Sequence, residues 1–334
     1  MSLGDRLGWL FKSQSELDLT DGPILGSLFF LSVPIVITNL LQVGYNLADT
    51  FWLGQYSTDA LAAISLGFPL VYLFISLGLG LTVAGSVLVA QHTGADQLAE
   101  AEYAASQTVV FTLLAGAVIG GVGFFLIAEL LQVFGAAPDV LGLATAYMEI
   151  ISLGLPCLFG FTVFIALMRG AGDTVTPMLV MFGTVVLNVA IDPILIFGWG
   201  PLPELGVEGA AVATVISRGS AMVAGLWLML RGRHGIQINL EDMWPDLDYS
   251  KKLLRIGGPA SIENTGRAIS VNLVLVIVTL FSTPVVAAFG VGLRVFSMVF
   301  MPAIAIDRGV EAMSGQNIGA GNLDRVSTIN RWAA

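Results

Sequence analysis

Long apolar stretches follow one another along most of this chain, and each is long enough to cross a lipid bilayer. A spanning helix needs about 20 mostly apolar residues. We predict eight spans, at residues 25–53, 60–90, 104–131, 140–168, 175–197, 209–230, 257–281 and 285–318. Because lipid offers the backbone no hydrogen-bond partners, the sequence predicts an all-α integral membrane protein that folds as a multi-span helix bundle.

Composition agrees with this fold class and excludes several functions. Hydrophobic residues make up 56% of the chain and charged residues 11%, against roughly 25% charged in an ordinary soluble domain. The net charge of −10 argues against nucleic acid as a partner. His92 and His234 are isolated in loops, so we expect no transition-metal site. The sequence has no Gly-rich nucleotide-binding loop with a Lys, and we expect no cofactor.

The basic residues indicate how the chain is oriented. Ten of the fourteen Lys and Arg residues fall in alternate loops, while the loops between them carry acidic residues instead. The positive-inside rule therefore places the N-terminus in the cytoplasm. We expect a multi-pass protein of the plasma membrane, with the lipid bilayer as its surroundings.

The second half of the chain matches the first half in a single register without a gap. Polar residues and prolines of the first half meet identical residues of the second: Pro34 and Pro259, Asn39 and Asn264, Gln91 and Gln316. If each repeat holds six spans, both repeats start on the same side of the membrane. They are then parallel and related by an axis along the membrane normal. Only two spans of the second repeat are present, so we expect a complete arrangement to hold about four more helices.

These features divide the chain into four parts. Residues 1–24 form a cytoplasmic N-terminal segment, and residues 25–230 form a first lobe of six transmembrane helices. Residues 231–256 form a cytoplasmic linker of mixed charge. Residues 257–334 begin a second lobe with helices 7 and 8, so this lobe is incomplete.

Polar stripes inside two spans mark a candidate site. One face of the first span carries Asn39, Gln42, Tyr45, Asn46 and Asp49. One face of the fifth span carries Thr184, Asn188 and Asp192. An intramembrane carboxylate costs about 2.5–3.5 kcal/mol, so each one points to a function. Helix–helix hydrogen bonding explains single amides, but it explains less well why both stripes end in an Asp.

The depth of the two acids predicts a shared pocket. Asp49 and Asp192 each lie about one turn from the outer end of their spans, and Thr214 falls at the same level in the sixth span. We therefore expect these side chains to converge on one water-filled pocket. Pro193 removes a helical hydrogen bond next to Asp192, which predicts a helix bend there.

The second lobe holds further charged residues inside its spans. Glu263 and Arg267 have the i,i+4 spacing of an ion pair. Arg308 and Glu311 can pair at i,i+3, which leaves Asp307 on a different face. Mutual neutralisation and function both remain open here, and Glu263 and Asp307 are candidates for a second-lobe cation or substrate site.

Several strings resemble one transporter family. Residues 187–198 (LNVAIDPILIFG), followed by 209–214 (GAAVAT), resemble the fifth and sixth helices of multidrug and toxic compound extrusion (MATE) transporters. The strings at 49–54 (DTFWLG) and 168–174 (MRGAGDT) fit the same family. The resemblance covers nearly the whole chain and is nearest to the archaeal and DinF-like branch.

The resemblance implies a two-lobed fold around a central cavity, built from parallel six-helix repeats. It also implies efflux of small organic, cationic compounds in exchange for H⁺ or Na⁺. Residue by residue, it implies cation coupling at Asp49, Asn188, Asp192 and Thr214. We predict that the two acids share one cation site, because two carboxylates in contact in a low-dielectric pocket cannot both stay ionised cheaply. We expect the protein to act as a monomer.

Two other functions remain open at this point. A lipid-linked oligosaccharide flippase of the same superfamily would need basic residues in its cavity to bind diphosphate, and the spans offer Arg218, Arg267, Arg294 and Arg308. A membrane-embedded enzyme is the third alternative. The GxGD string at 170–173 is typical of intramembrane aspartyl proteases, but Asp173 falls in a turn without a second Asp facing it inside the bilayer. We therefore expect no enzyme.

Overall fold

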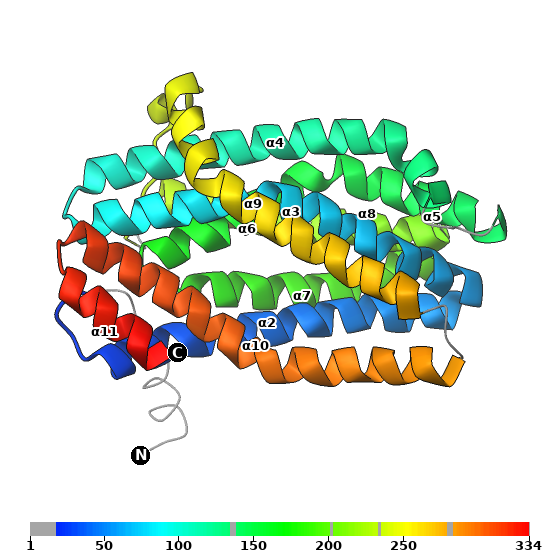
Figure 1. Ribbon diagram of the computed structural model, residues 1–334. Helices are drawn as coiled ribbons and strands as arrows, with labels where there is room; N and C mark the ends of the chain where they lie inside the picture. The colour runs from blue at the N-terminus through cyan, green and yellow to red at the C-terminus, as the bar shows by residue number, and fades with distance from the viewer. Residues whose placement is uncertain (1–17, 134–137, 201–202, 233–234, 279–282, 334) are drawn as a thin grey trace, which may run out of the picture.

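The chain folds into long helices that run side by side along one axis (Figure 1). The computed structural model describes residues 18–133, 138–200, 203–232, 235–278 and 283–333, with the backbone alone for several residues between 271 and 298. Its helices are α2 (Ile24–Tyr56), α3 (Thr58–Gly94), α4 (Leu98–Val133), α5 (Pro138–Leu153), α6 (Leu155–Gly170), α7 (Val175–Phe197), α8 (Gly206–Leu230), α9 (Leu247–Val278), α10 (Thr283–Gly319) and α11 (Leu323–Ala333). The predicted all-α fold class is confirmed. Residues 1–17 of the expected N-terminal segment lie outside the described residues.

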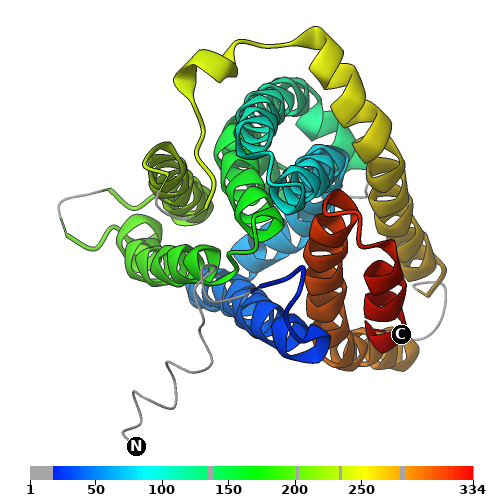
Figure 2. The same ribbon diagram turned by 90° about the vertical axis from the view of Figure 1, so that its left-hand side faces the viewer.

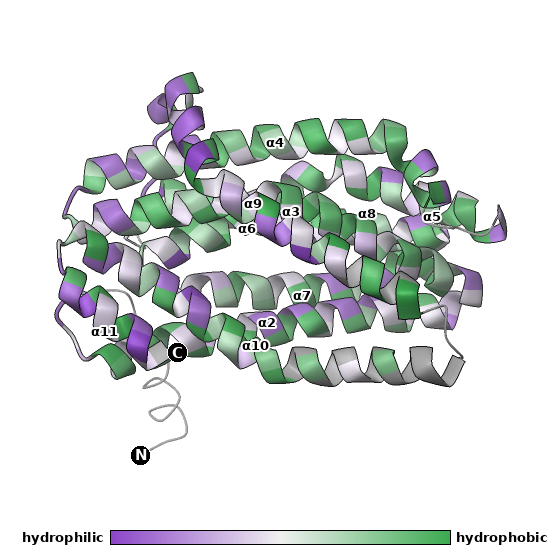
Figure 3. Ribbon diagram, in the orientation of Figure 1, coloured by the Kyte–Doolittle hydropathy of each residue, from purple (hydrophilic) through white to green (hydrophobic). Residues whose placement is uncertain are grey.

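The predicted spans and the observed helices agree closely. The span expected at 175–197 is α7 with the same bounds, and most other helices extend a few residues beyond the predicted ends. Within the described residues, α2, α3, α4, α7 and α8 are long and apolar enough to cross a membrane. The bent pair of α5 and α6 counts as a sixth span if it is taken as one. Hydrophobic residues dominate the middle of the bundle and hydrophilic ones gather toward its ends (Figure 3).

One predicted span is divided in the structure. The sequence predicts a single span at 140–168, whereas α5 and α6 meet at Gly154 with a bend of 52°. Pro156 explains the break, because proline has no N–H and its ring collides with the carbonyl group four residues earlier. That carbonyl belongs to Ser152, in the last turn of α5.

Helix α3 lies at the centre of the bundle. It packs against α2, α4, α5, α6 and α8 of the first repeat and against α9 and α10 of the second. Seen along the bundle axis, the other long helices surround it (Figure 2). The two repeats therefore meet mainly along α3, and α10 also packs against α2.

The turns alternate between the two ends of the bundle. The turns at 95–97, 171–174 and 320–322 lie at the end where residue 18 lies, which we call the N-terminal end (Figure 1). The junction of α2 with α3, the end of α7 and the start of α8 lie at the opposite end. Successive long helices therefore run in opposite directions, as consecutive membrane spans must when short turns connect them.

The internal repeat is visible in the helix bounds. Helices α3 and α10 have the same length, and both their first and their last residues are matched by the register that sets Pro34 against Pro259. The same register matches the first residues of α4 and α11. The turns that follow α3 and α10 agree as well, because Asp96 and Gly321 hold equivalent positions and both have positive φ, of 55° and 78°. The structure agrees with the repeat predicted from the sequence.

Helices α3 and α10 touch each other through equivalent residues. A Cβ atom added to Gly94 would collide with the backbone of Gln316, and one added to Gly319 would collide with the backbone of Gln91. Such a reciprocal contact is the signature of a two-fold axis between the two helices. The absence of a side chain at both glycines lets the backbones approach closely, as small residues do in membrane helix pairs.

The linker between the repeats is held against α4. The side-chain amide of Gln107 donates to the carbonyl oxygens of Asp242 (2.5 Å) and Trp244 (2.8 Å) and accepts from the Asp246 N–H (3.0 Å). The Tyr103 hydroxyl donates to Asp246 (2.8 Å), and this bond lowers the pKa of that carboxyl group. Helix α9 begins at Leu247, inside the range predicted as linker.

We predict that Gly94→Ala and Gly319→Ala each destabilise the protein by about 1–3 kcal/mol, because the new methyl group overpacks a backbone contact. The two losses should be similar, since the positions are equivalent. The free energy of unfolding in mixed detergent micelles measures both.

Gly121→Ala in α4 is the matched control, because a Cβ there meets nothing within 4 Å. It should be neutral or stabilise the helix by up to about 1 kcal/mol. Wild-type stability in both Gly94→Ala and Gly319→Ala would show that α3 and α10 do not pack as described.

Candidate functional site

Three helices of the first repeat bring the predicted polar residues together. Helix α2 packs against α7 and α8, and α7 packs against α8. Asp49 of α2 is 5% exposed and Thr214 of α8 is 7% exposed, while Asn188 and Asp192 of α7 are fully buried. The helical spacing that put each residue on one face also turns those faces toward one another.

The two carboxyl groups are in direct contact. The carboxyl group of Asp49 lies against that of Asp192 and beside the side chain of Asn188, close enough for a hydrogen bond when one acid is protonated. The Asn188 amide donates to Asp192 Oδ1 at 3.0 Å. Thr214 lies beside the Tyr45 hydroxyl. We call Asp49, Asn188, Asp192 and Thr214 the acid cluster.

Each member of the acid cluster has a buried oxygen atom without a hydrogen-bond donor among the described residues. These atoms are Asp49 Oδ1, Asn188 Oδ1, Asp192 Oδ2 and Thr214 Oγ1. Buried polar atoms are normally paired, so four unpaired oxygens in one cluster need an explanation. Carboxylate, amide and hydroxyl oxygens are suitable ligands for a proton or a hard cation.

The cluster borders a cavity of about 440 Å³. Asp49 and Thr214 line this cavity, together with Gln42, Tyr45 and Asn46 of the predicted α2 stripe. Asn188 and Asp192 lie behind Asp49, away from the cavity surface. The volume is in the range of small-molecule sites, and one acid is thus accessible from the cavity while the other is not.

The cluster forms a polar layer between two apolar clusters of the core. On α2, Tyr45 belongs to one apolar cluster and Leu53 to the other, with Asp49 midway between them. On α7, Met181 and Ile196 flank Asn188 and Asp192 in the same way. The acid cluster therefore borders the cavity on one side and packed apolar residues on two others.

The other residues of the predicted stripes lie outside the acid cluster. The Gln42 amide donates to Asn46 Oδ1 at 3.1 Å, and Asn39 is half-buried further along α2. The Thr184 hydroxyl donates to the carbonyl oxygen of Val180, four residues back, at 2.8 Å. Pro193 is buried within α7, which continues as a helix to Phe197.

The two candidate residues of the second lobe, Glu263 and Asp307, lie outside the acid cluster. Glu263 pairs with Arg267 at 3.2 Å, and both side chains are exposed. Arg308 pairs with Glu311 at 2.9 Å, as the spacing predicts, and Asp307 is exposed. A role for Glu263 and Asp307 in a separate second-lobe site stays a prediction.

Arg218 is the cavity residue that the sequence left without a role at this site. It lies on α8 and lines the cavity with Asp49. The signal that could have found it is its spacing, because Arg218 follows Thr214 by one helical turn on the same face. Its partners come from other helices, so the sequence alone does not name them.

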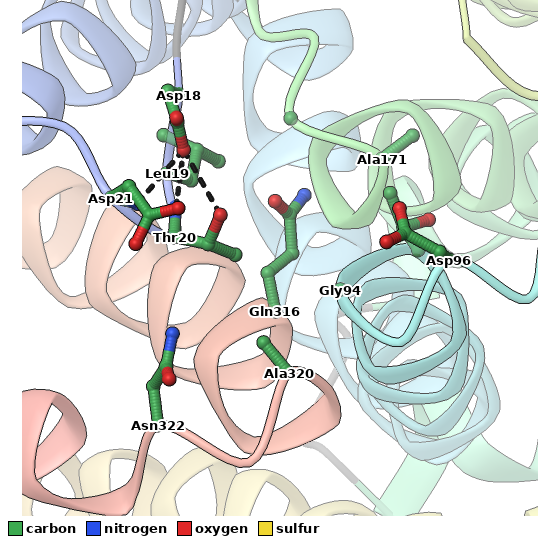
Figure 4. Close-up of a pocket in the computed structure, with 12 residues that line it drawn as sticks. Asp18, Leu19, Thr20, Asp21, Gly94, Asp96, Ala171, Gln316, Ala320 and Asn322 are labelled. Atoms are coloured by element: carbon green, nitrogen blue, oxygen red, sulfur yellow. Dashed lines mark hydrogen bonds between the residues drawn. The ribbon is translucent and has the colours of Figure 1, made fainter.

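A second cavity, of about 530 Å³, lies at the N-terminal end. The ends of α3, α6 and α10 meet there with residues 18–21 (Figure 4). Gln316 donates to the carbonyl oxygen of Gly170 at 3.1 Å, and Asn317 donates to that of Leu19 at 2.9 Å. These bonds join the two repeats at the end farther from the acid cluster.

Comparison with known proteins identifies the family. The MatE family model matches residues 34–194 and 259–333, and the two matched segments begin at Pro34 and Pro259, which the internal repeat sets opposite each other. The chain is 30% identical to the probable multidrug resistance protein YoeA of Bacillus subtilis over 91% of its own length and 67% of that protein. It is also 30% identical to the FAD transporter of Shewanella oneidensis, over 92% of this chain and 68% of that protein.

A solved structure agrees with these matches. An outward-facing multidrug resistance MATE family transporter of the MOP superfamily superposes with a TM-score of 0.86 at 28% identity, over 96% of this chain and 71% of that one. The chain thus spans about two thirds of the length of its relatives. The archaeal and DinF-like branch stays a prediction. By its sequence, repeat and fold, the chain belongs to the MatE family of multi-pass membrane transporters, which are not enzymes.

Proposed function

We propose that this protein is a secondary active antiporter that exports organic, cationic compounds in exchange for H⁺ or Na⁺. The observation that carries the proposal is the contact between Asp49 and Asp192 beside the cavity, with buried oxygens of Asn188 and Thr214 next to it. The relatives named as multidrug resistance proteins support export of organic compounds.

The acid cluster has the chemistry of an ion-coupling site. Two carboxyl groups in contact share one proton at little cost, whereas two carboxylates there repel each other in a low dielectric. A Na⁺ ion relieves the same repulsion, and the amide and hydroxyl oxygens complete its ligands. Binding of either ion changes the net charge of the cluster by +1.

The position of Asp49 explains how an ion and a substrate exclude each other. Asp49 faces both the cavity and Asp192, so it neutralises either a substrate cation or the coupling ion. Each ligand then lowers the affinity for the other, and this reciprocal coupling is what exchange requires. We infer that a bend at Pro193 links the charge of the cluster to the shape of the cavity.

We also propose the setting in which the protein acts. The basic residues concentrate in the segments at the N-terminal end, which favours the cytoplasm for that end and a plasma-membrane location. The first repeat buries its own acid cluster, which favours a monomer as the active unit.

A flippase for lipid-linked oligosaccharides is the less favoured function. It would need several free cations in the cavity, yet Arg267 and Arg308 each pair with a glutamate. Arg218 is the cavity arginine among the described side chains, and the side chain of Arg294 lies outside them.

We predict that Asp192→Asn abolishes ion-driven efflux and preserves the fold, because it keeps the shape of the side chain and removes the group that shares the ion. Asn188→Ala should weaken efflux by a smaller factor, about tenfold, since one neutral ligand is lost. The measurement is ethidium efflux from vesicles of the full-length protein under a Na⁺ or a H⁺ gradient.

Glu129→Gln is the control for that experiment, because it makes the same acid-to-amide change away from the cavity, on α4. It should leave efflux unchanged. If Asp192→Asn keeps the wild-type rate of ion-driven efflux, the coupling site lies outside the acid cluster and the proposal is overturned.

We further predict that Asp49→Asn and Asp192→Asn are strongly non-additive in stability. Either change alone removes the repulsion between the carboxyl groups, so the second change gains little. A double-mutant cycle of unfolding free energies in detergent, at one pH and without Na⁺, should give a coupling energy of about 1–3 kcal/mol. Additive values would mean that the two carboxyl groups do not interact.

A further inference from the structure

Arg218 lines the cavity from helix α8. It lies near the middle of helix α8, close to the depth at which transporters bind their substrates. Its guanidinium carbon lies 4.4 Å from the centre of the Tyr45 ring and 5.4 Å from that of Phe161. Contact with two aromatic faces stabilises the cation and fixes the orientation of its plane.

The partners of Arg218 leave part of its hydrogen-bonding capacity unused. The guanidinium donates to Gln42 Oε1 at 2.7 Å and to the Met181 sulfur at 3.6 Å. Gln42 in turn donates to Asn46, which orients its oxygen toward Arg218. A guanidinium has five N–H donors, so donors remain for a ligand in the cavity.

Arg218 differs from the other described arginines within the spans. Arg267 lies 3.2 Å from Glu263, and Arg308 lies 2.9 Å from Glu311. Among the described residues, no carboxylate lies at ion-pair distance from the Arg218 nitrogens. A cation inside the membrane normally pairs or serves a function, and Arg218 is oriented without a paired anion.

The cavity therefore carries charges of both signs. Asp49 supplies an acid and Arg218 a guanidinium, and both line the same 440 Å³ space. Phe68, Tyr72 and Tyr147 add aromatic walls. A ligand that complements all three features has a planar ring system, a cationic group and an oxyanion.

We propose that the cavity binds planar organic cations that also carry an oxyanion, a carboxylate or a phosphate, and that Arg218 binds this oxyanion. This inference rests on the proposed function, because it takes the cavity as the substrate site. Guanidinium groups bind carboxylate and phosphate through paired hydrogen bonds, which a neutral ester cannot replace. Asp49 remains available to the cationic part of the ligand.

Two dyes that differ at one group test the proposal. Rhodamine 110 carries a free carboxylate, and rhodamine 123 is its methyl ester with the same ring system. We expect the purified full-length protein in detergent to bind rhodamine 110 about tenfold more tightly or better, measured by fluorescence polarisation. Arg218→Gln should remove this preference by weakening rhodamine 110 alone.

Arg267→Gln is the matched control, because it removes the same charge from an exposed, paired site. It should keep the preference for the carboxylate dye. If Arg218→Gln does not fold, Arg218→Lys replaces it and should reduce the preference by a smaller factor, since lysine lacks the planar fork. Equal binding of both dyes by the wild type, or an unchanged preference in Arg218→Gln, overturns the proposal.

Two further arms separate the alternatives. If phosphatidylglycerol added to neutral-lipid nanodiscs displaces rhodamine 110 from the wild type, a lipid headgroup occupies the site and the substrate assignment is overturned. The second arm measures efflux of rhodamine 123 by the wild type, which we expect to be driven by an ion gradient. If the wild type shows no ion-driven efflux but still prefers the carboxylate dye, the antiport function is refuted and the oxyanion site is still supported.

Discussion

The backbone contact between α3 and the helices of the second repeat holds this structure together. Gly80 of α3 meets Gly257 of α9 so closely that a methyl group on either would collide with the other backbone. Gly94 and Gly319 make the reciprocal contact with α10. Without a hydrophobic force between helices in lipid, such packing and the hydrogen bond from Gly80 N–H to Ser261 (3.1 Å) provide the association.

The acid cluster lies on three helices of the first repeat, not on α3 itself. Helices α2, α7 and α8 pack against one another, with α3 on one side of the cavity. The acids lie where the two apolar clusters of the core separate. They meet each other, and no ion pair joins either of them to a described lysine or arginine. A buried acid pair without a direct counter-charge changes its state readily when a proton or a cation becomes available.

In the antiport mechanism proposed above, opposite charges in one cavity make the site selective in two ways. Asp49 connects the cavity to the buried Asp192, so its charge depends on the bound ion. The rings of Tyr45 and Phe161 hold the guanidinium of Arg218 in place. In that mechanism the acid side responds to the ion gradient, while the basic side gives a preference for one class of ligand.

The sequence by itself determined the spans, their number in the first repeat, the register that sets Pro34 against Pro259, and the faces on which the polar residues lie. These features follow from local rules, namely apolar length, helical spacing and identity in register. It missed the break at Gly154 despite Pro156, because residues 150–161, apart from Ser152, are apolar and continue a single stretch of spanning length. Only the tertiary structure decided that Asp49 touches Asp192, that Thr184 bonds its own helix, and that Arg218 stacks on Tyr45. Each of these depends on how helices rotate and pack against one another, and helical spacing does not encode that rotation.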